Sequence, residues 1–92
     1  MQFVMKGSLD EALKRQLKRM IAVESDKGMD PESIGDDDPL FGEQSPVQLD
    51  SLDLIQLSIA IYKTYGLKIT DSKDARRAFA TVNSLADEVQ PQ

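Results

Sequence analysis

The 92-residue sequence contains no cysteine, no histidine and no tryptophan. Without cysteine, the chain has no disulfide, no thiol nucleophile and no thiolate metal ligand. Without histidine, it lacks the side chain that most often serves as a general base or metal ligand. We therefore expect neither an independent enzyme nor a metal site.

Long hydrophobic runs are also missing. No segment approaches the ~18 consecutive apolar residues that a transmembrane helix needs, and the first residues lack the pattern of a signal peptide. The length predicts one domain over residues 1–92, with flexible ends at 1–7 and 90–92. We expect a cytoplasmic monomer without membrane insertion.

Basic residues are fewer than acidic ones, 11 against 16, which gives a net charge of −5. Between residues 24 and 53, ten acidic residues accompany Lys27 alone. Such a segment repels phosphates, so nucleic acid is not an expected partner. A basic protein surface complements it, although the same charges are also typical of well-solvated loops.

Hydrophobic periodicity and capping signals predict an all-α bundle of four helices, three long and one short. The first is expected to begin at Ser8, because Glu11 follows at the spacing of a capping box. Leu9 opens its apolar stripe, which fades after Val23. The basic residues of this helix fall mostly on the opposite face: Lys14, Arg15, Lys18 and Arg19.

The other three helices lie in the second half of the chain. The second runs from a cap at Asp50 or Ser51 to Tyr65, and Gly66 ends it. A short helix over 71–79 exposes two arginines, and Thr81 caps the last helix, which runs through Val89 before Pro91 ends it. Alternation at 67–69 has the pattern of a short strand, on too few residues to decide.

A long loop is predicted between the first two helices, over residues 26–49. It contains three of the four prolines, three of the five glycines and the acidic run 36–38. A loop of this length is unusual in a compact domain unless it is functional or held in place. The apolar residues expected to hold it are Ile34, Leu40, Phe41, Val47 and Leu49.

The second helix has more apolar residues than one core-facing side requires. Leu52, Ile55 and Ile59 form a second stripe at helical spacing. This stripe is either a partner-binding surface or part of a central helix that the bundle buries on nearly all sides.

Ser51 stands where the loop meets this helix. A phosphate esterified there would lie near the open amides of the helix N-terminus. Since no histidine or cysteine can activate the hydroxyl, another enzyme must carry out any reaction at Ser51. Alternatively, Ser51 only caps the helix. The acidic run lacks the alternating spacing of a calcium-binding loop.

The stretch LDSLDLIQL at 49–57, continued by YGLKI at 65–69, resembles the acyl carrier proteins. Leu40-Phe41-Gly42 and Thr81-Val82 are similar to that family's loop and last helix, so the resemblance covers roughly residues 8–90. It implies a four-helix carrier fold in which Ser51, flanked by Asp50 and Leu52, carries 4′-phosphopantetheine.

The same resemblance implies partners. A holo-carrier synthase (a phosphopantetheinyl transferase) would transfer the group from coenzyme A. An acyl ligase or acyltransferase, a ketosynthase and related enzymes of fatty acid, polyketide or related lipid biosynthesis would use the acyl thioesters. The implied partner contacts are Asp50, Leu52, Asp53, Ile55, Gln56 and Ile59. The implied acyl pocket is lined by Leu13, Leu57, Ile61, Phe79 and Leu85.

The sequence departs from the family pattern on two helices. Gln56, Tyr62 and Lys63 stand at positions that the family usually makes acidic, and Arg76 and Arg77 lie in the third helix, which is commonly acidic. Our hypothesis is a specialised carrier with its own ligase or synthase, distinct from the housekeeping carrier of fatty acid synthesis. A peptidyl carrier and an unmodified acidic interaction module are the alternatives.

Overall fold

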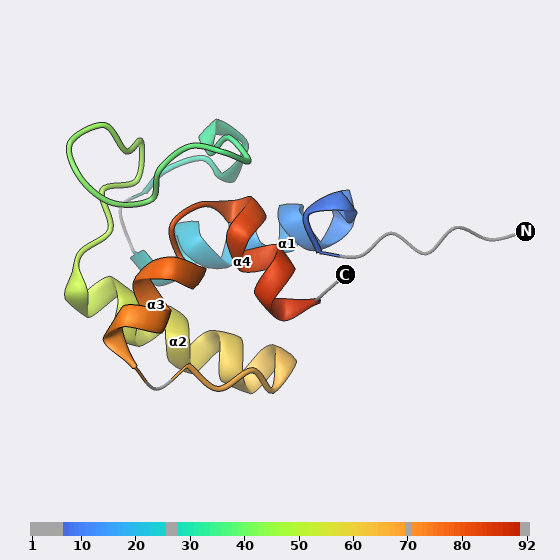
Figure 1. Cartoon of the computed structure of the whole chain (residues 1–92). Coiled ribbons are helices and arrows are strands. Elements are labelled where there is room, and N and C mark those ends of the chain that lie inside the picture. The colour runs from blue at the N-terminus through green and yellow to red at the C-terminus, as the bar shows by residue number, and fades with distance from the viewer. Residues whose placement is uncertain (1–6, 26–27, 70, 91–92) are drawn as a thin grey trace, which may run out of the picture.

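The computed structural model describes residues 7–25, 28–69 and 71–90. Its α-helices are α1 (Glu11–Ser25), α2 (Ser51–Tyr65), α3 (Ser72–Ala78) and α4 (Val82–Val89) (Figure 1). Two 3-10 turns, η1 (Gly7–Leu9) and η2 (Pro31–Ser33), lie before α1 and in the long loop. The predicted all-α class is confirmed.

Two of the helices are long and two are short. Helices α1 and α2 have 15 residues each, whereas α3 has seven and α4 has eight. The predicted range of the last helix is right, but eight residues do not make it a long helix. Leu67 and Ile69 do not form a strand; they lie in irregular backbone and pack partly against the core.

The start of α1 differs from the prediction. Asp10 caps this helix, because its Oδ1 accepts a hydrogen bond from the Leu13 amide at 3.1 Å. Ser8 lies in η1 instead, where its amide donates to Asp87 Oδ1 at 2.8 Å. The predicted Ser8–Glu11 capping box is therefore wrong, and Leu9, which we placed in the apolar stripe, is 56% exposed.

Turn η1 packs against α4 and brings the two ends of the described chain together. Gly7 is buried with a left-handed φ of 57°, and a Cβ there would collide with Asp87 and with the Gln90 carbonyl. Its amide donates to Gln90 Oε1 at 3.3 Å. Gly7 and Gln90 are thus placed by a direct contact, while the rest of the predicted flexible ends lies outside the described residues.

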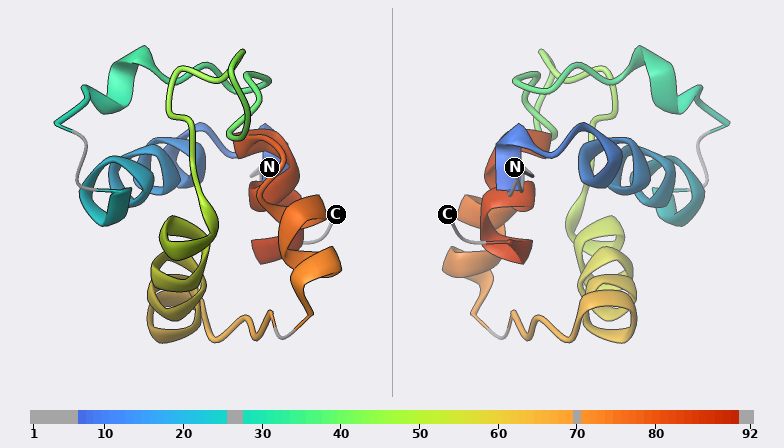
Figure 2. Two further views of the ribbon diagram at one scale, coloured as in Figure 1. Left: turned by 90° about the vertical axis from the view of Figure 1, so that its left-hand side faces the viewer. Right: turned by 90° about the vertical axis from the view of Figure 1, so that its right-hand side faces the viewer.

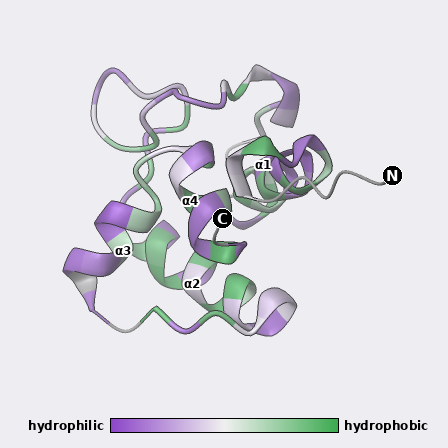
Figure 3. Cartoon of the chain, turned by 45° about the vertical axis from the view of Figure 1, so that its right-hand side comes forward, coloured by the Kyte–Doolittle hydropathy of each residue, from purple (hydrophilic) through white to green (hydrophobic). Residues whose placement is uncertain are grey.

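The hydrophobic core lies between α1, α2 and the α3–α4 pair. Figure 3 shows hydrophobic residues along much of α2, and the structure buries only one of its apolar faces completely. Each large side chain buried here contributes ~1.5–3 kcal/mol relative to an exposed one. The fully buried large side chains are Leu17, Ile21, Ile34, Leu40, Val47, Leu57, Ile61, Phe79, Val82 and Leu85.

The long loop is held against the other end of the chain, as Figure 2 shows. The Leu40 amide donates to the Ala80 carbonyl at 3.0 Å, and the Leu49 amide donates back to the Leu40 carbonyl at 2.8 Å. Four of the five predicted anchors are buried and Phe41 is half-buried. The loop, which leads directly into α2, is therefore fixed at both Leu40 and Leu49.

An ion-pair cluster holds the acidic run of the loop on α1. Lys14 Nζ lies 2.8 Å from Asp36 Oδ2, and Lys18 Nζ lies 2.7 Å from Asp36 Oδ1. The Lys14 side chain is only 6% exposed, so its predicted place on the polar face is wrong. The hydrogen bond from Lys14 is the main cause that lowers the pKa of Asp36, and the same bond raises the pKa of Lys14.

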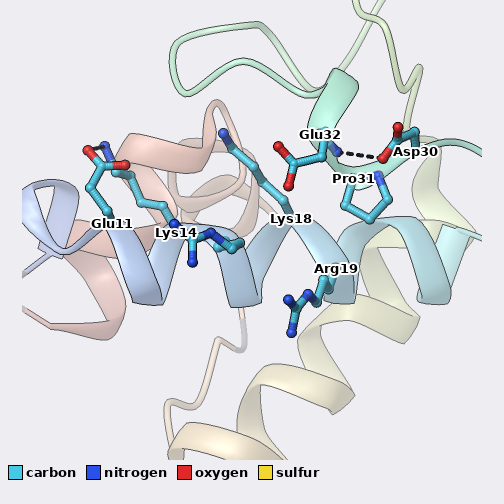
Figure 4. A pocket seen from close by; sticks show the side chains of 8 residues that line it. Glu11, Lys14, Lys18, Arg19, Asp30, Pro31 and Glu32 are labelled. Carbon is cyan, nitrogen blue, oxygen red and sulfur yellow. Dashed lines mark hydrogen bonds and ion pairs between the residues drawn. The ribbon is translucent and has the colours of Figure 1, made fainter.

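Next to this cluster, a polar hollow of about 300 Å³ lies between α1 and η2. In Figure 4, Lys18 extends from α1 toward the side of η2, whereas Arg19 points the other way. Asp30 caps η2 by accepting from the Glu32 amide at 2.9 Å. The hollow is lined by basic residues of α1 and by acidic residues of both α1 and the loop, so it lies where the loop meets the helix.

Candidate functional site

Ser51 is the first residue of α2 and its side chain is exposed. The preceding residue, Asp50, caps the helix: its Oδ1 accepts from the Asp53 amide at 2.9 Å. Asp53 Oδ2 accepts in return from the Asp50 amide at 3.1 Å. This reciprocal capping box fixes the first turn of α2 and leaves the Ser51 hydroxyl facing solvent.

The first turn of α2 also has open backbone donors. The backbone amides of Ser51 and Leu52 donate no hydrogen bond to any described residue. The Ser51 hydroxyl likewise forms no hydrogen bond with a described residue. The aligned peptide dipoles of a 15-residue helix add positive potential at this end. A phosphate joined to Ser51 Oγ would thus find hydrogen-bond donors and a favourable field.

Two hollows open on either side of Ser51. The first, of about 310 Å³, is lined by Phe41, Leu49, Asp50, Ser51, Leu54 and Arg76. The second, also of about 310 Å³, is lined by Ser51, Leu54, Ile55, Ile69, Asp71, Ala75 and Arg76. Both are lined by residues of α2 and α3, and both combine apolar side chains with Arg76.

The predicted partner face is exposed, with one exception. The apolar stripe of Leu52, Ile55 and Ile59 is 61%, 58% and 50% exposed, so the bundle does not bury α2 on all sides. Asp50 and Gln56 are exposed as well. Asp53 is buried, because its carboxylate turns back to the Asp50 amide. Its role toward a partner stays a prediction.

The residues predicted to line an acyl pocket are brought together in the core. Leu13, Leu57, Ile61, Phe79 and Leu85 are all buried in one cluster. None of the five lines either hollow beside Ser51. The sequence analysis treated Phe41 and Leu49 only as loop anchors and Arg76 only as an exposed charge. Their position beside Ser51 depends on tertiary packing and has no local signal.

Comparison with known families assigns this chain to a family. A family model described as the phosphopantetheine attachment site matches residues 12–89, which is most of the chain and includes Ser51. The chain belongs to the phosphopantetheine attachment site family. The resemblance to acyl carrier proteins is confirmed at this level. No curated protein and no solved structure matches the sequence significantly.

The cofactor that this family attaches is 4′-phosphopantetheine. The residues around Ser51 fit such a group. The side chain offers an unhindered hydroxyl, the first turn of α2 offers open amides, and the flanking hollows offer apolar walls. Among the described residues, no helix is long and apolar enough to cross a membrane, and no cluster of metal-binding side chains occurs.

Proposed function

We propose that this protein is an acyl carrier whose attachment residue is Ser51. The observation that carries the proposal is the exposed Ser51 hydroxyl at the N-terminus of α2, which has no hydrogen-bond partner among the described residues and lies inside the matched family range. In the loading step, Ser51 Oγ bonds to the phosphorus next to the pantetheine of coenzyme A. The pyrophosphate bond breaks, adenosine 3′,5′-bisphosphate leaves, and the hydroxyl proton passes to a base of the transferase.

The chain depends on partner enzymes for this step and for later ones. It contains no histidine or cysteine to activate Ser51, and its own residues near Ser51 are aspartates used as helix caps and one arginine. The base and the catalytic machinery therefore belong to a holo-carrier synthase. Biosynthetic enzymes then load, extend or collect the acyl group.

We place partner docking on the exposed stripe of Leu52, Ile55 and Ile59, with Asp50 and Gln56 beside it. Exposed apolar side chains along a helix are typical anchors for a partner groove. The stripe itself carries little negative charge, because the only acidic residue within α2 is the buried Asp53 and Lys63 adds a positive charge in the last turn. Docking therefore depends more on apolar contact than on charge.

This surface supports a specialised carrier with its own ligase or synthase. Tyr62 and Lys63 continue the same face of α2, where the usual carriers have acidic residues. Enzymes of general fatty acid synthesis that read an acidic helix should therefore turn over the loaded protein poorly. Turnover equal to that of a housekeeping carrier would contradict the specialised role and leave the carrier role intact.

The acyl shelter is the second part of the proposal. A chain on the arm would leave Ser51 through the hollow between α2 and α3 and reach the apolar core beneath Leu54. Each methylene that it buries contributes ~0.8 kcal/mol. The core side chains that would separate to admit it are Leu13, Leu57, Ile61, Phe79 and Leu85.

Intact-mass measurement tests the attachment residue. The wild type, incubated with coenzyme A and a phosphopantetheinyl transferase, should gain the mass of one phosphopantetheinyl group, and Ser51→Ala should gain none. Ser58→Ala is the matched control, because it removes a hydroxyl from the same helix and should load fully. Labelling of Ser51→Ala would refute the site, and an unmodified wild type would indicate an interaction module.

A further inference from the structure

Arg76 is the one basic side chain that lines the two hollows beside Ser51, as far as the described residues show. It belongs to α3, which lines these hollows together with the start of α2. Ser51, Leu54 and Arg76 are common to both hollows. A group attached to Ser51 therefore meets Arg76 whichever of the two hollows it enters.

The guanidinium of Arg76 is available for a ligand. Arg76 is exposed, and no carboxylate among the described residues pairs with it. The two acidic residues that line the hollows are engaged as helix caps: Asp50 accepts from the Asp53 amide and Asp71 accepts from the Lys73 amide at 2.9 Å. The neighbouring Arg77 is different, since its Nη2 lies 3.3 Å from Asp74 Oδ1 and it lines neither hollow.

The negative charges around Ser51 explain why a cation would stabilise a phosphodiester attached there. A phosphodiester on Ser51 carries a negative charge and would stand next to Asp50, with Asp53 in the same first turn of α2. Two open amides and the helix dipole offset part of this repulsion. A guanidinium adds a full positive charge and a planar pair of donors that match phosphate oxygens.

We propose that Arg76 binds the phosphodiester of the arm on Ser51 and directs the arm along α3. This inference rests on the proposed attachment at Ser51. Arg76 acts as a positioning residue: it holds the phosphate end, so the thiol end is presented from the groove between α2 and α3. Arg76 lies in α3, which is commonly acidic in the acyl carrier proteins. Binding of the phosphodiester gives the departure from that pattern a function.

Phosphorus NMR of the loaded protein tests the contact directly. The wild type, Arg76→Gln and Arg77→Gln are loaded to completion, as judged by intact mass, and their phosphodiester resonances are compared. Arg76→Gln should shift the resonance and narrow it, because the arm is released. Arg77→Gln is the matched control and should coincide with the wild type. Added salt should move the wild-type resonance toward that of Arg76→Gln.

A second measurement needs no variant. In 15N-labelled wild type, the side-chain Nε–H resonance of Arg76 should move on loading, and that of Arg77 should stay in place. Coincident phosphorus resonances for all three proteins, or an unmoved Arg76 resonance in fully loaded wild type, would overturn the role of Arg76 alone. Failure of the wild type to gain mass would instead overturn the attachment at Ser51, and this inference with it.

Discussion

At the scale of single residues, the backbone that leads to Ser51 has an unusual feature. Gln48 has a φ of 53°, and it is the one non-glycine residue with positive φ in the described ranges. Its amide and that of Val47 both donate to Ser45 Oγ, at 2.8 and 3.0 Å, and Ser45 is buried. This turn sets the direction in which the loop enters α2.

Left-handed backbone costs a residue with a Cβ ~1–2 kcal/mol. Gln48→Gly should therefore be more stable than Gln48→Ala by about 1 kcal/mol, as measured by urea unfolding. Gln44, an exposed residue of the same loop without positive φ, is the control. Gln44→Gly should be less stable than Gln44→Ala. Equal stabilities of the Gln48 variants would show that the turn relaxes without cost.

The element scale shows what local sequence can specify. The starts of α2 and α4 and the end of α2 were predicted correctly, because Asp50, Thr81 and Gly66 act on backbone groups within a few positions. At α1, the predicted cap Ser8 is wrong, because Asp10 accepts the hydrogen bond from the Leu13 amide and caps the helix. The choice is made by the packing of η1 on α4, which has no local signal.

The candidate site likewise has features that local sequence specifies and features that depend on tertiary packing. Ser51 could be predicted, because its tripeptide and the start of the helix are local features. The hollows beside it could not, because they bring Phe41 from the loop and Arg76 from α3 to α2. The buried position of Lys14 was missed for the same reason, since its partner Asp36 lies 22 residues away.

Helix α2 offers a matched pair of isoleucines. Ile61 is fully buried, whereas Ile59 is 50% exposed on the stripe that we propose for docking. In urea unfolding, Ile61→Ala should lower the free energy of unfolding by ~2–5 kcal/mol, and Ile59→Ala should change it by less than about 0.5 kcal/mol.

Ile59→Ala also tests docking without a large loss of stability. Ile59→Ala should lower kcat/KM of the phosphopantetheinyl transferase roughly five-fold or more, which corresponds to a loss of about 1 kcal/mol at the interface. The exposed Lys73→Ala on α3 provides the surface control and should load as the wild type does. A folded Ile59→Ala protein that loads at the wild-type rate would show that the stripe does not bind the transferase.

At the scale of the whole molecule, the acidic loop is a structural connection as well as a charged surface. Asp36 pairs with two lysines of α1, and its backbone carbonyl accepts from the Asn83 amide of α4 at 3.0 Å. The loop thereby joins the first helix to the last, and α2 begins where the loop ends (Figure 2). Charge repulsion within the run 36–38 is tolerated because Asp36 is neutralised.

This connection makes stability depend on pH. The pKa of Asp36 is lowered from its ordinary 3.8. Its contribution to the free energy of unfolding is therefore present above that pH and disappears as the pH falls through the lower pKa of the folded state.

Asp36→Asn should lower the free energy of unfolding by about 1–3 kcal/mol near pH 7, because it leaves the buried Lys14 charge underpaired. The deficit, followed by urea unfolding, should shrink below about pH 4. Glu43→Gln removes an exposed, unpaired charge of the same loop and should show no such deficit. A deficit that persists unchanged in acid would mean that Asp36 acts by packing, not by charge.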